Sequence, residues 1–268
     1  MTVILAATWE PRGELGRLKP MVGELSELYA GMIVVMPPSI DEGIVSELAA
    51  LPVIEAVTSV DWYGGRHHAV RIALDKQAGA IHYCDLDRLI HWVECYPDEI
   101  GQVVRRIGEA DCLITGRTER AWSTHPRCMA ETEPMFSMVF SYLLGIKADF
   151  GAGSMGLSRR AAEYVIANGS AEWGWAIDTA WPLMLHRTGF TLGYQATEGL
   201  EWESADRYRD MAADAETRVR LAAEMDQDAA AWKHRAYVAH EITRVGMIAA
   251  ELFPANGKDL LQRNMEKS

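Results

Sequence analysis

The sequence lacks the features that would mark a disulfide-stapled or membrane-spanning protein. Its 4 cysteines form no C-x-x-C pair and no spacing typical of a zinc site, so neither a disulfide framework nor a zinc module is expected. The longest apolar stretch, around residues 135–146, is too short to span a bilayer. The first residues, MTVILAATWEPRG, have no basic region before a short apolar run. We therefore expect no signal peptide and predict a cytoplasmic protein.

Positive charge is also scarce. The chain carries 26 Lys and Arg against 38 Asp and Glu, a formal net charge of −12, and residues 1–100 hold 7 basic and 15 acidic groups. This balance argues against nucleic acid or an anionic membrane as the main partner. The rest of the composition, 268 residues with 49% hydrophobic and 24% charged, is that of a globular protein of one or two domains.

The first 120 residues alternate short β-branched runs with helical patterns. Strands are predicted at 3–9, 32–36, 53–57, 80–84 and 112–115, and helices at 20–29, 41–51, 66–77 and 97–110. This order predicts a mostly parallel sheet with helices on both faces. Ligands of such sheets bind beyond the carboxyl ends of the strands.

The remaining chain is more helical. Helices are predicted at 131–144, at 159–167 and at 175–186, the last interrupted by Pro182, with extended segments at 150–157 and 191–202. From residue 206 to 252 one alanine-rich apolar stripe runs at helical spacing. A single helix of that span would be about 65–70 Å long, which exceeds a domain of this size. We therefore expect a break, or a helix that packs on a second copy in a homodimer.

Two carboxylates, Asp85 and Asp87, end the predicted strand at 80–84. At that edge of a sheet, such a pair suits a hard divalent cation that also holds a diphosphate, although a turn or a helix cap is the other interpretation. A second D-x-D, Asp226 and Asp228, falls within the helical stripe and is predicted to be a solvated pair.

A glycine-rich stretch, GGRHHAVRIAL at 64–74, precedes the first D-x-D and opens a helix with a basic residue. Such a helix start can bring backbone N–H groups and a cation to a phosphate. Together with the D-x-D, it resembles the GT-A nucleotide-sugar glycosyltransferases of the family-2 type. The matching places are held by Arg66, Ala69, Gly79, Asp85 and Asp87.

This resemblance covers about residues 3–205 and implies the domain plan. The implied fold is α/β, a GT-A (Rossmann-like) mostly parallel sheet flanked by helices, followed by a long C-terminal helical segment. Residues 1–205 would form the catalytic domain, with a nucleotide-binding half at 1–118 and an acceptor half at 119–205. Residues 206–268 would form the helical extension.

On the donor side, the resemblance implies a turn beside the nucleotide base at Thr8-Trp9-Glu10. The acid that usually ends the second strand is missing, because that strand ends in Met-Pro-Pro-Ser, and Asp61 could take its place. Arg66 would pair with phosphate or base. Gly153 and Ser154, in the segment GAGSMG, would run under the donor sugar.

On the acceptor side, Asp178 stands where inverting members place the general base that activates the acceptor hydroxyl. Trp173 and Trp175 could form a sugar platform or pack in the core. The same run is similar to mannosylglycerate synthase and glucosyl-3-phosphoglycerate synthase types, which are retaining. Those enzymes supply a third metal ligand, a histidine, where this chain has Glu201-Trp202-Glu203. Either a glutamate replaces it or the metal site is weaker; we favour inversion.

The sequence therefore predicts a metal-dependent glycosyltransferase that moves a sugar from a nucleotide-diphosphate sugar to a hydroxyl acceptor, with Mg²⁺ or Mn²⁺ held by Asp85 and Asp87. Two alternatives stay open. A non-catalytic nucleotide-sugar-binding relative is favoured by the missing acid and histidine. A sugar-1-phosphate nucleotidyltransferase is suggested by RGELGRLKP at 12–20, which lacks the glycine pair of that class and has its Lys and Pro in reversed order.

Overall fold

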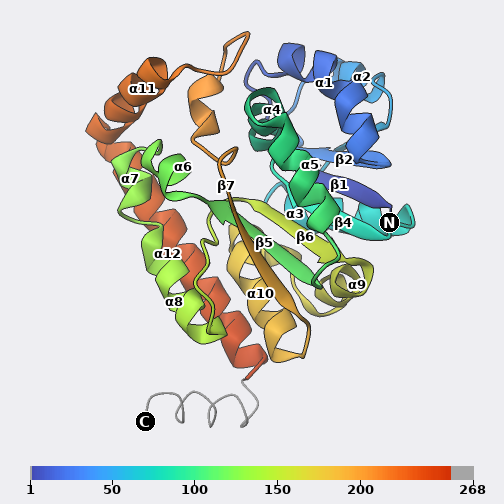
Figure 1. The fold of residues 1–268 in the computed structure, drawn as a ribbon, viewed down its shortest axis with the longest axis vertical. Coiled ribbons are helices and arrows are strands. Elements are labelled where there is room, and N and C mark those ends of the chain that lie inside the picture. Colours follow the sequence, from blue (N-terminus) through green and yellow to red (C-terminus); the bar gives the residue numbers. More distant parts are fainter. Residues whose placement is uncertain (1, 255–268) are drawn as a thin grey trace.

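The computed structural model describes residues 2–254, and its centre is a seven-stranded sheet in the order β3-β2-β1-β4-β6-β5-β7 (Figure 1). Strand β6 pairs antiparallel with β4 and β5, and the other neighbours pair in parallel. The predicted fold class, an α/β fold with a mostly parallel sheet flanked by helices and a C-terminal helical segment, is confirmed. The strands are β1 (Val3–Thr8), β2 (Gly31–Met36), β3 (Ile54–Thr58), β4 (Ala80–Cys84), β5 (Cys112–Arg117), β6 (Ser154–Ser158) and β7 (Leu192–Thr197).

Helices cover both faces of this sheet. They are α1 (Leu15–Leu28), α2 (Glu42–Ala49), α3 (Gly65–Asp75), α4 (Leu86–Cys95), α5 (Pro97–Arg106), α6 (Glu119–Ser123), α7 (Arg127–Ala130), α8 (Pro134–Leu144), α9 (Arg159–Asn168), α10 (Ile177–Arg187), α11 (Ala215–Gln227) and α12 (Ala229–Leu252), with 3₁₀ turns η1 (Ala171–Ala176) and η2 (Glu203–Asp206). None of the helices within residues 2–254 combines the length and the apolar character that a bilayer crossing needs.

The central strand β1 is buried on both faces, and its alternate residues enter different cores, as the period of a strand requires. Val3, Leu5 and Ala7 pack in one cluster with residues of α1, α4 and α5. Ile4 and Ala6 pack in a second cluster with residues of α3, α9, α10 and α12. Burial on both faces explains why β1 and β2 are continuous apolar runs rather than alternating ones.

The elements predicted before residue 120 are confirmed at β1 to β5 and at α2, α3 and α5. Two predictions about prolines are wrong: that a helix begins at Pro20, and that Pro182 interrupts a helix. Helix α1 begins at Leu15 and runs through Pro20, and α10 runs through Pro182 without a break. A proline inside a helix removes one backbone hydrogen bond. The residues on both sides of Pro182 are fully buried, so core packing offsets that loss.

The sequence did not predict helix α4, which sets the positions of Asp85 and Asp87. Its buried residues Leu86, Leu89, Ile90 and Val93 recur at helical spacing against the sheet. Because α4 begins immediately after β4, Asp85 occupies the position before the first helical residue, and Asp87 lies in the first turn.

The long C-terminal stripe is broken, as one of the two expectations proposed. Asp228 ends α11 and caps the start of α12, accepting a hydrogen bond from the amide of Ala230. Helix α12 packs within its own chain, alongside α8 and α10 (Figure 1), and places Ala239, Ile242 and Val245 in the core. Residues 255–268 of the predicted extension lie outside the described residues.

The second D-x-D was predicted to be a solvated pair; Asp228 is exposed and Asp226 is half-buried, and both carboxylates cap helix starts. Asp226 accepts hydrogen bonds from the amides of Arg127 and Cys128 at the start of α7, at 3.0 and 2.9 Å, and Asp228 caps α12. Aspartate is favoured at such positions because its oxygen satisfies the unpaired amides of the first turn. These local roles distinguish this pair from Asp85 and Asp87.

Candidate active site

A polar cavity of about 340 Å³ opens at the carboxyl ends of β1 and β4. This is the edge of a parallel sheet at which ligands bind. Predicted residues that line the cavity are Thr8, Glu10, Arg66, Asp85, Asp87 and Trp175. Residues that the sequence did not single out, among them Arg12, Arg207 and His234, join them from other elements.

The carboxylate of Asp85 faces this cavity and makes no capping hydrogen bond to α4 within the described part of the chain. Its Oδ1 accepts hydrogen bonds from the Thr8 hydroxyl at 2.8 Å and the Tyr83 hydroxyl at 2.5 Å. Its Oδ2 accepts one from Arg66 Nη2 at 2.8 Å. Burial opposes the charged form, but Arg66 and Arg88 hold the pKa of Asp85 below its ordinary value. This residue is therefore an ionised anchor for Arg66, not a helix cap.

Arg66 joins Asp85 to Asp178. Its Nη1 donates to Asp178 Oδ2 at 3.3 Å, and all three side chains are largely buried. Asp178 lies in the first turn of α10, more than a hundred residues from Asp85 in sequence. Burial raises the pKa of Asp178 to about 6, although Arg66 acts to lower it. A buried carboxylate with a pKa near neutrality is suited to accept a proton.

Asp87 is paired with another acid. Burial first, and then the negative charges of Glu203 and Asp85, raise the pKa of Asp87 to about 7. Glu203 opens η2 and is buried, and its Oε2 has no hydrogen-bond partner among residues 2–254. Two adjacent carboxylates and an unpaired buried oxygen fit a hard divalent cation, which prefers oxygen ligands. In Asp85, by contrast, protein donors already engage both oxygens.

Gly153 lies against Asp85; that its backbone runs under a donor sugar stays a prediction. Its φ is +59°, and a Cβ there would come within 2.7 Å of Asp85 Oδ2. Ser154 follows it but points elsewhere, because its hydroxyl contacts His82 Nε2 at 2.9 Å in the buried interior. The backbone of this segment therefore borders the site, while the Ser154 side chain does not.

The remaining predicted site residues differ in how far they are buried. Trp175 lines the cavity, whereas Trp173 is 7% exposed and packs in the core. Gly174 between them has a φ of +48°, a backbone reversal that separates the two rings. Glu10 is exposed at the rim and pairs with Arg12 at 2.9 Å. Asp61 accepts a hydrogen bond from the Tyr63 amide in the loop after β3 and is not among the residues lining the cavity.

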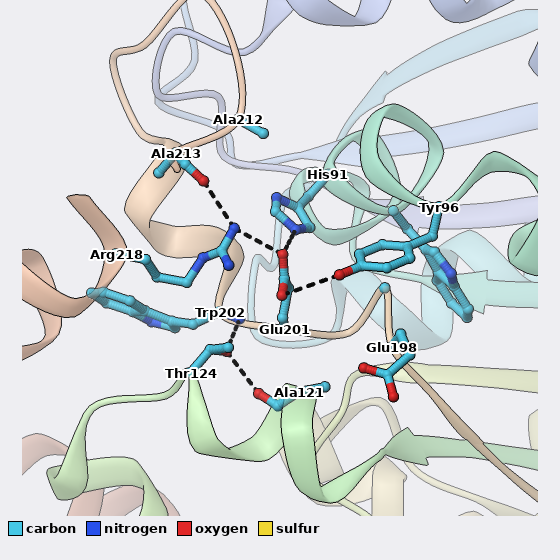
Figure 2. Close-up of polar contacts among 12 residues, drawn as sticks. His91, Tyr96, Ala121, Thr124, Glu198, Glu201, Trp202, Ala212, Ala213 and Arg218 are labelled. Carbon is cyan, nitrogen blue, oxygen red and sulfur yellow. Dashed lines mark hydrogen bonds and ion pairs between the residues drawn. The ribbon is translucent and has the colours of Figure 1, made fainter. Parts of the chain in front are cut away.

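A separate, buried charge network includes His91 and Glu201, both labelled in Figure 2. His91, on α4, contacts Asp206 through Nδ1 at 2.6 Å and Glu201 through Nε2 at 3.0 Å. Burial alone would lower the pKa of His91, but hydrogen bonds with Asp206, Cys95 and Glu201 raise it well above the ordinary value. His91 is therefore an imidazolium between two carboxylates.

Potential metal-ligand atoms of His91, Cys95 and Glu201 lie within 4.8 Å of one another in this network. Figure 2 shows that Glu201 is also held by Arg218, at 2.8 Å, and it accepts a further hydrogen bond from Arg120 at 2.5 Å. With cations on both of its oxygens, Glu201 is already neutralised without an ion. The network instead ties α4, which carries Asp87, to the segment that carries Glu203.

The comparisons with known proteins are sparse. No protein-family model and no curated protein matches the chain. Among solved structures, the chain is similar to S. aureus TarS 1–349 in complex with UDP. The identity is 12% and the TM-score 0.39, over 90% of this chain and 70% of that one. A likeness of this size assigns no residue and no activity.

Proposed function

We propose that the protein is a nucleotide-sugar glycosyltransferase that transfers a sugar from a nucleotide-diphosphate sugar to a hydroxyl acceptor. One observation carries the proposal: Arg66 is bonded to both Asp85, at the carboxyl end of β4, and Asp178, while Asp87 lines the same cavity as Asp85. Such a grouping provides an anion-binding cation, a carboxylate pair and a base at two adjoining cavities that share Arg66. Sugar transfer from a diphosphate needs all three.

The carboxylates of Asp87 and Glu203 would hold the divalent cation, Mg²⁺ or Mn²⁺, of a metal-dependent enzyme. When bound, such an ion neutralises charge that develops on the leaving diphosphate. Arg12 and Arg207 line the same cavity and can contact phosphate oxygens directly. Asp85 keeps Arg66 in place; as a metal ligand itself, it would have to give up one of its present hydrogen bonds.

Asp178 would act as the general base of an inverting reaction, taking the proton of the acceptor hydroxyl as the new glycosidic bond forms. An aromatic wall stands beside it. Tyr63 and Trp175 meet edge to face at 5.6 Å, and Trp175 and His234 meet edge to face at 6.3 Å. Aromatic faces of this kind pack against the apolar faces of sugars. Thr8 and Glu10 line the same cavity and would contact the donor.

A thermal-shift panel of nucleotide sugars, with and without Mn²⁺, tests the proposal. We expect one donor to raise the unfolding temperature, and to do so more strongly with the metal, because ligands that bind the folded state stabilise it. The matched control is Asp87→Asn, in which the metal-dependent part of the shift should vanish. No shift with any donor, metal present or absent, would contradict the proposal. A shift without turnover on any hydroxyl compound would instead favour the binding-only relative.

The rate of transfer should depend on pH through Asp178. A base must be ionised to accept a proton, so kcat/KM at saturating metal, which reports the ionisation of the free enzyme, should be constant above pH 7 and fall tenfold per pH unit below about 6. The measurement is kcat/KM between pH 5 and pH 8, with far-ultraviolet circular dichroism as the control for unfolding. A flat profile through pH 6 would exclude Asp178 as the base.

A further inference from the structure

A second, smaller cavity of about 150 Å³ adjoins the first and shares Arg66, Trp175 and His234 with it. Beyond these shared residues its charged lining is Asp178 from α10, Arg88 from α4, Arg235 from α12 and Glu133, the residue before α8. A water molecule occupies about 30 Å³ in the liquid, so this space can hold a group of a few heavy atoms. The candidate base therefore faces a compartment with three arginines.

Only part of this positive charge is neutralised by carboxylates of the described residues. Arg66 is paired with Asp85 and Asp178. The Nε of Arg88 stands 3.7 Å from Asp85 and 3.9 Å from Glu203, beyond hydrogen-bond distance. Burial opposes the charged form of Arg88, but the charges of Glu203, Asp85 and Asp87 outweigh it and raise the pKa of Arg88. A backbone carbonyl, that of Ala152, accepts the hydrogen bond that Arg88 Nη1 donates at 2.7 Å.

Arg235 is the least satisfied of the three. Its contact with Glu133 is long, at 3.9 Å, and Glu133 accepts a hydrogen bond from Arg117 at 2.9 Å. Its Nε is buried and has no hydrogen-bond partner anywhere in the described part of the chain. Burial lowers the pKa of Arg235 and the nearby charge of Arg88 adds to this, although the charges of Glu133 and Glu203 act to raise it, so the positive charge of Arg235 is compensated only in part.

Arg235 is half-buried, and its nearest carboxylate stands 3.9 Å away. The planar fork of donors in a guanidinium matches the two oxygens of a carboxylate or phosphate. We propose that the second cavity binds an anionic group, a carboxylate or a phosphate, between Arg235 and Arg88 and beside Asp178. Assigning this group to a substrate rests on the proposed function, whereas its binding does not. The group belongs either to the transferred sugar, as a uronic acid, or to an acidic acceptor.

Calorimetric titration of the full chain with inorganic phosphate tests the binding itself. We expect Arg235→Gln to weaken phosphate binding about tenfold or more, and Arg235→Lys to recover part of it, because a charged hydrogen bond is lost and then partly replaced. Arg220→Gln is the matched control. It removes an arginine from an exposed pair with Glu224 on α11 and should leave the affinity unchanged.

Two outcomes would overturn this inference directly: no phosphate binding to the wild-type chain, or a phosphate affinity in Arg235→Gln equal to that of wild type. A third is a loss of phosphate affinity in Arg207→Gln instead, which would place the anion in the first cavity. Arg235→Gln should retain the fold, since it removes only the 3.9 Å contact with Glu133. The unfolding temperature without phosphate checks this.

Two further arms separate the sources of the anion. Nucleotide sugars with a uronic acid are compared with their neutral counterparts, and phosphorylated or carboxylated hydroxyl compounds with neutral ones, each on wild type and Arg235→Gln. If wild type prefers the acidic compound of a pair and Arg235→Gln does not, that compound, donor or acceptor, carries the anionic group. Equal transfer with acidic and neutral members in the wild type overturns the assignment of the anion to a substrate and leaves the proposed function intact. Phosphate binding without any transfer contradicts the proposed function alone.

Discussion

Replacing Asp178 with asparagine is expected to reduce sugar transfer about 10²- to 10⁴-fold, the usual contribution of a general base. Asparagine keeps the size of the side chain and an oxygen that can accept the hydrogen bond from Arg66, but it cannot take up a proton. Donor affinity should therefore stay near that of wild type. Turnover and calorimetric donor binding, measured on the same preparation, check the two halves of this expectation.

The control for Asp178→Asn is Asp98→Asn, which changes the same chemical group in the exposed first turn of α5. Its turnover should equal that of wild type. If Asp178→Asn lost donor binding together with transfer, Asp178 would be a structural partner of Arg66 and not the base.

Asp87→Asn is expected to lower turnover about a thousandfold or more, since a bound metal supplies several kcal/mol of charge stabilisation to a reaction of this kind. The same variant should not lose stability. A carboxyl whose pKa is raised on folding to about 7 takes up a proton when the chain folds. Its contribution to the free energy of unfolding therefore falls as pH rises from near 4 to about 7, and stays low above that.

Without metal, Asp87→Asn should then unfold at the same temperature as wild type near pH 4 and at a higher temperature at pH 8. Adding Mn²⁺ should raise the unfolding temperature of wild type and of Asp98→Asn, but not that of Asp87→Asn. Glu203→Gln should behave like Asp87→Asn, because the two acids oppose one another. Wild-type turnover in either variant would remove that residue from the metal site.

Local sequence patterns were enough to predict most of the sheet. The strands before residue 120 are short apolar runs bounded by turn residues, so their positions depend on neighbours in the sequence. Helix α4 was missed because it follows β4 without a loop, and its apolar residues merge with those of the strand. The D-x-D was found, but only α4 shows that Asp85 faces the cavity without capping the helix.

The candidate site was harder to predict, because its partners are far apart in sequence. The segment Glu201-Trp202-Glu203 contains two acids, and spacing alone cannot tell which one faces Asp87. In the fold, Glu201 turns inward to His91, and Glu203 is left to oppose Asp87. Arg235 lies in an alanine-rich helix that resembles a packing element. Its position beside Asp178 depends on how α12 docks against α10.

Arg66 can couple donor binding to the protonation of Asp178. Its positive charge lowers the proton affinity of Asp178, so any displacement of Arg66 toward the phosphates of an incoming donor would release that effect. Asp178 would then become the stronger base only when the donor is in place. By reciprocity, protonation of Asp178 would alter donor affinity by the same factor. A single guanidinium can thus suppress premature deprotonation of an acceptor until a donor is present.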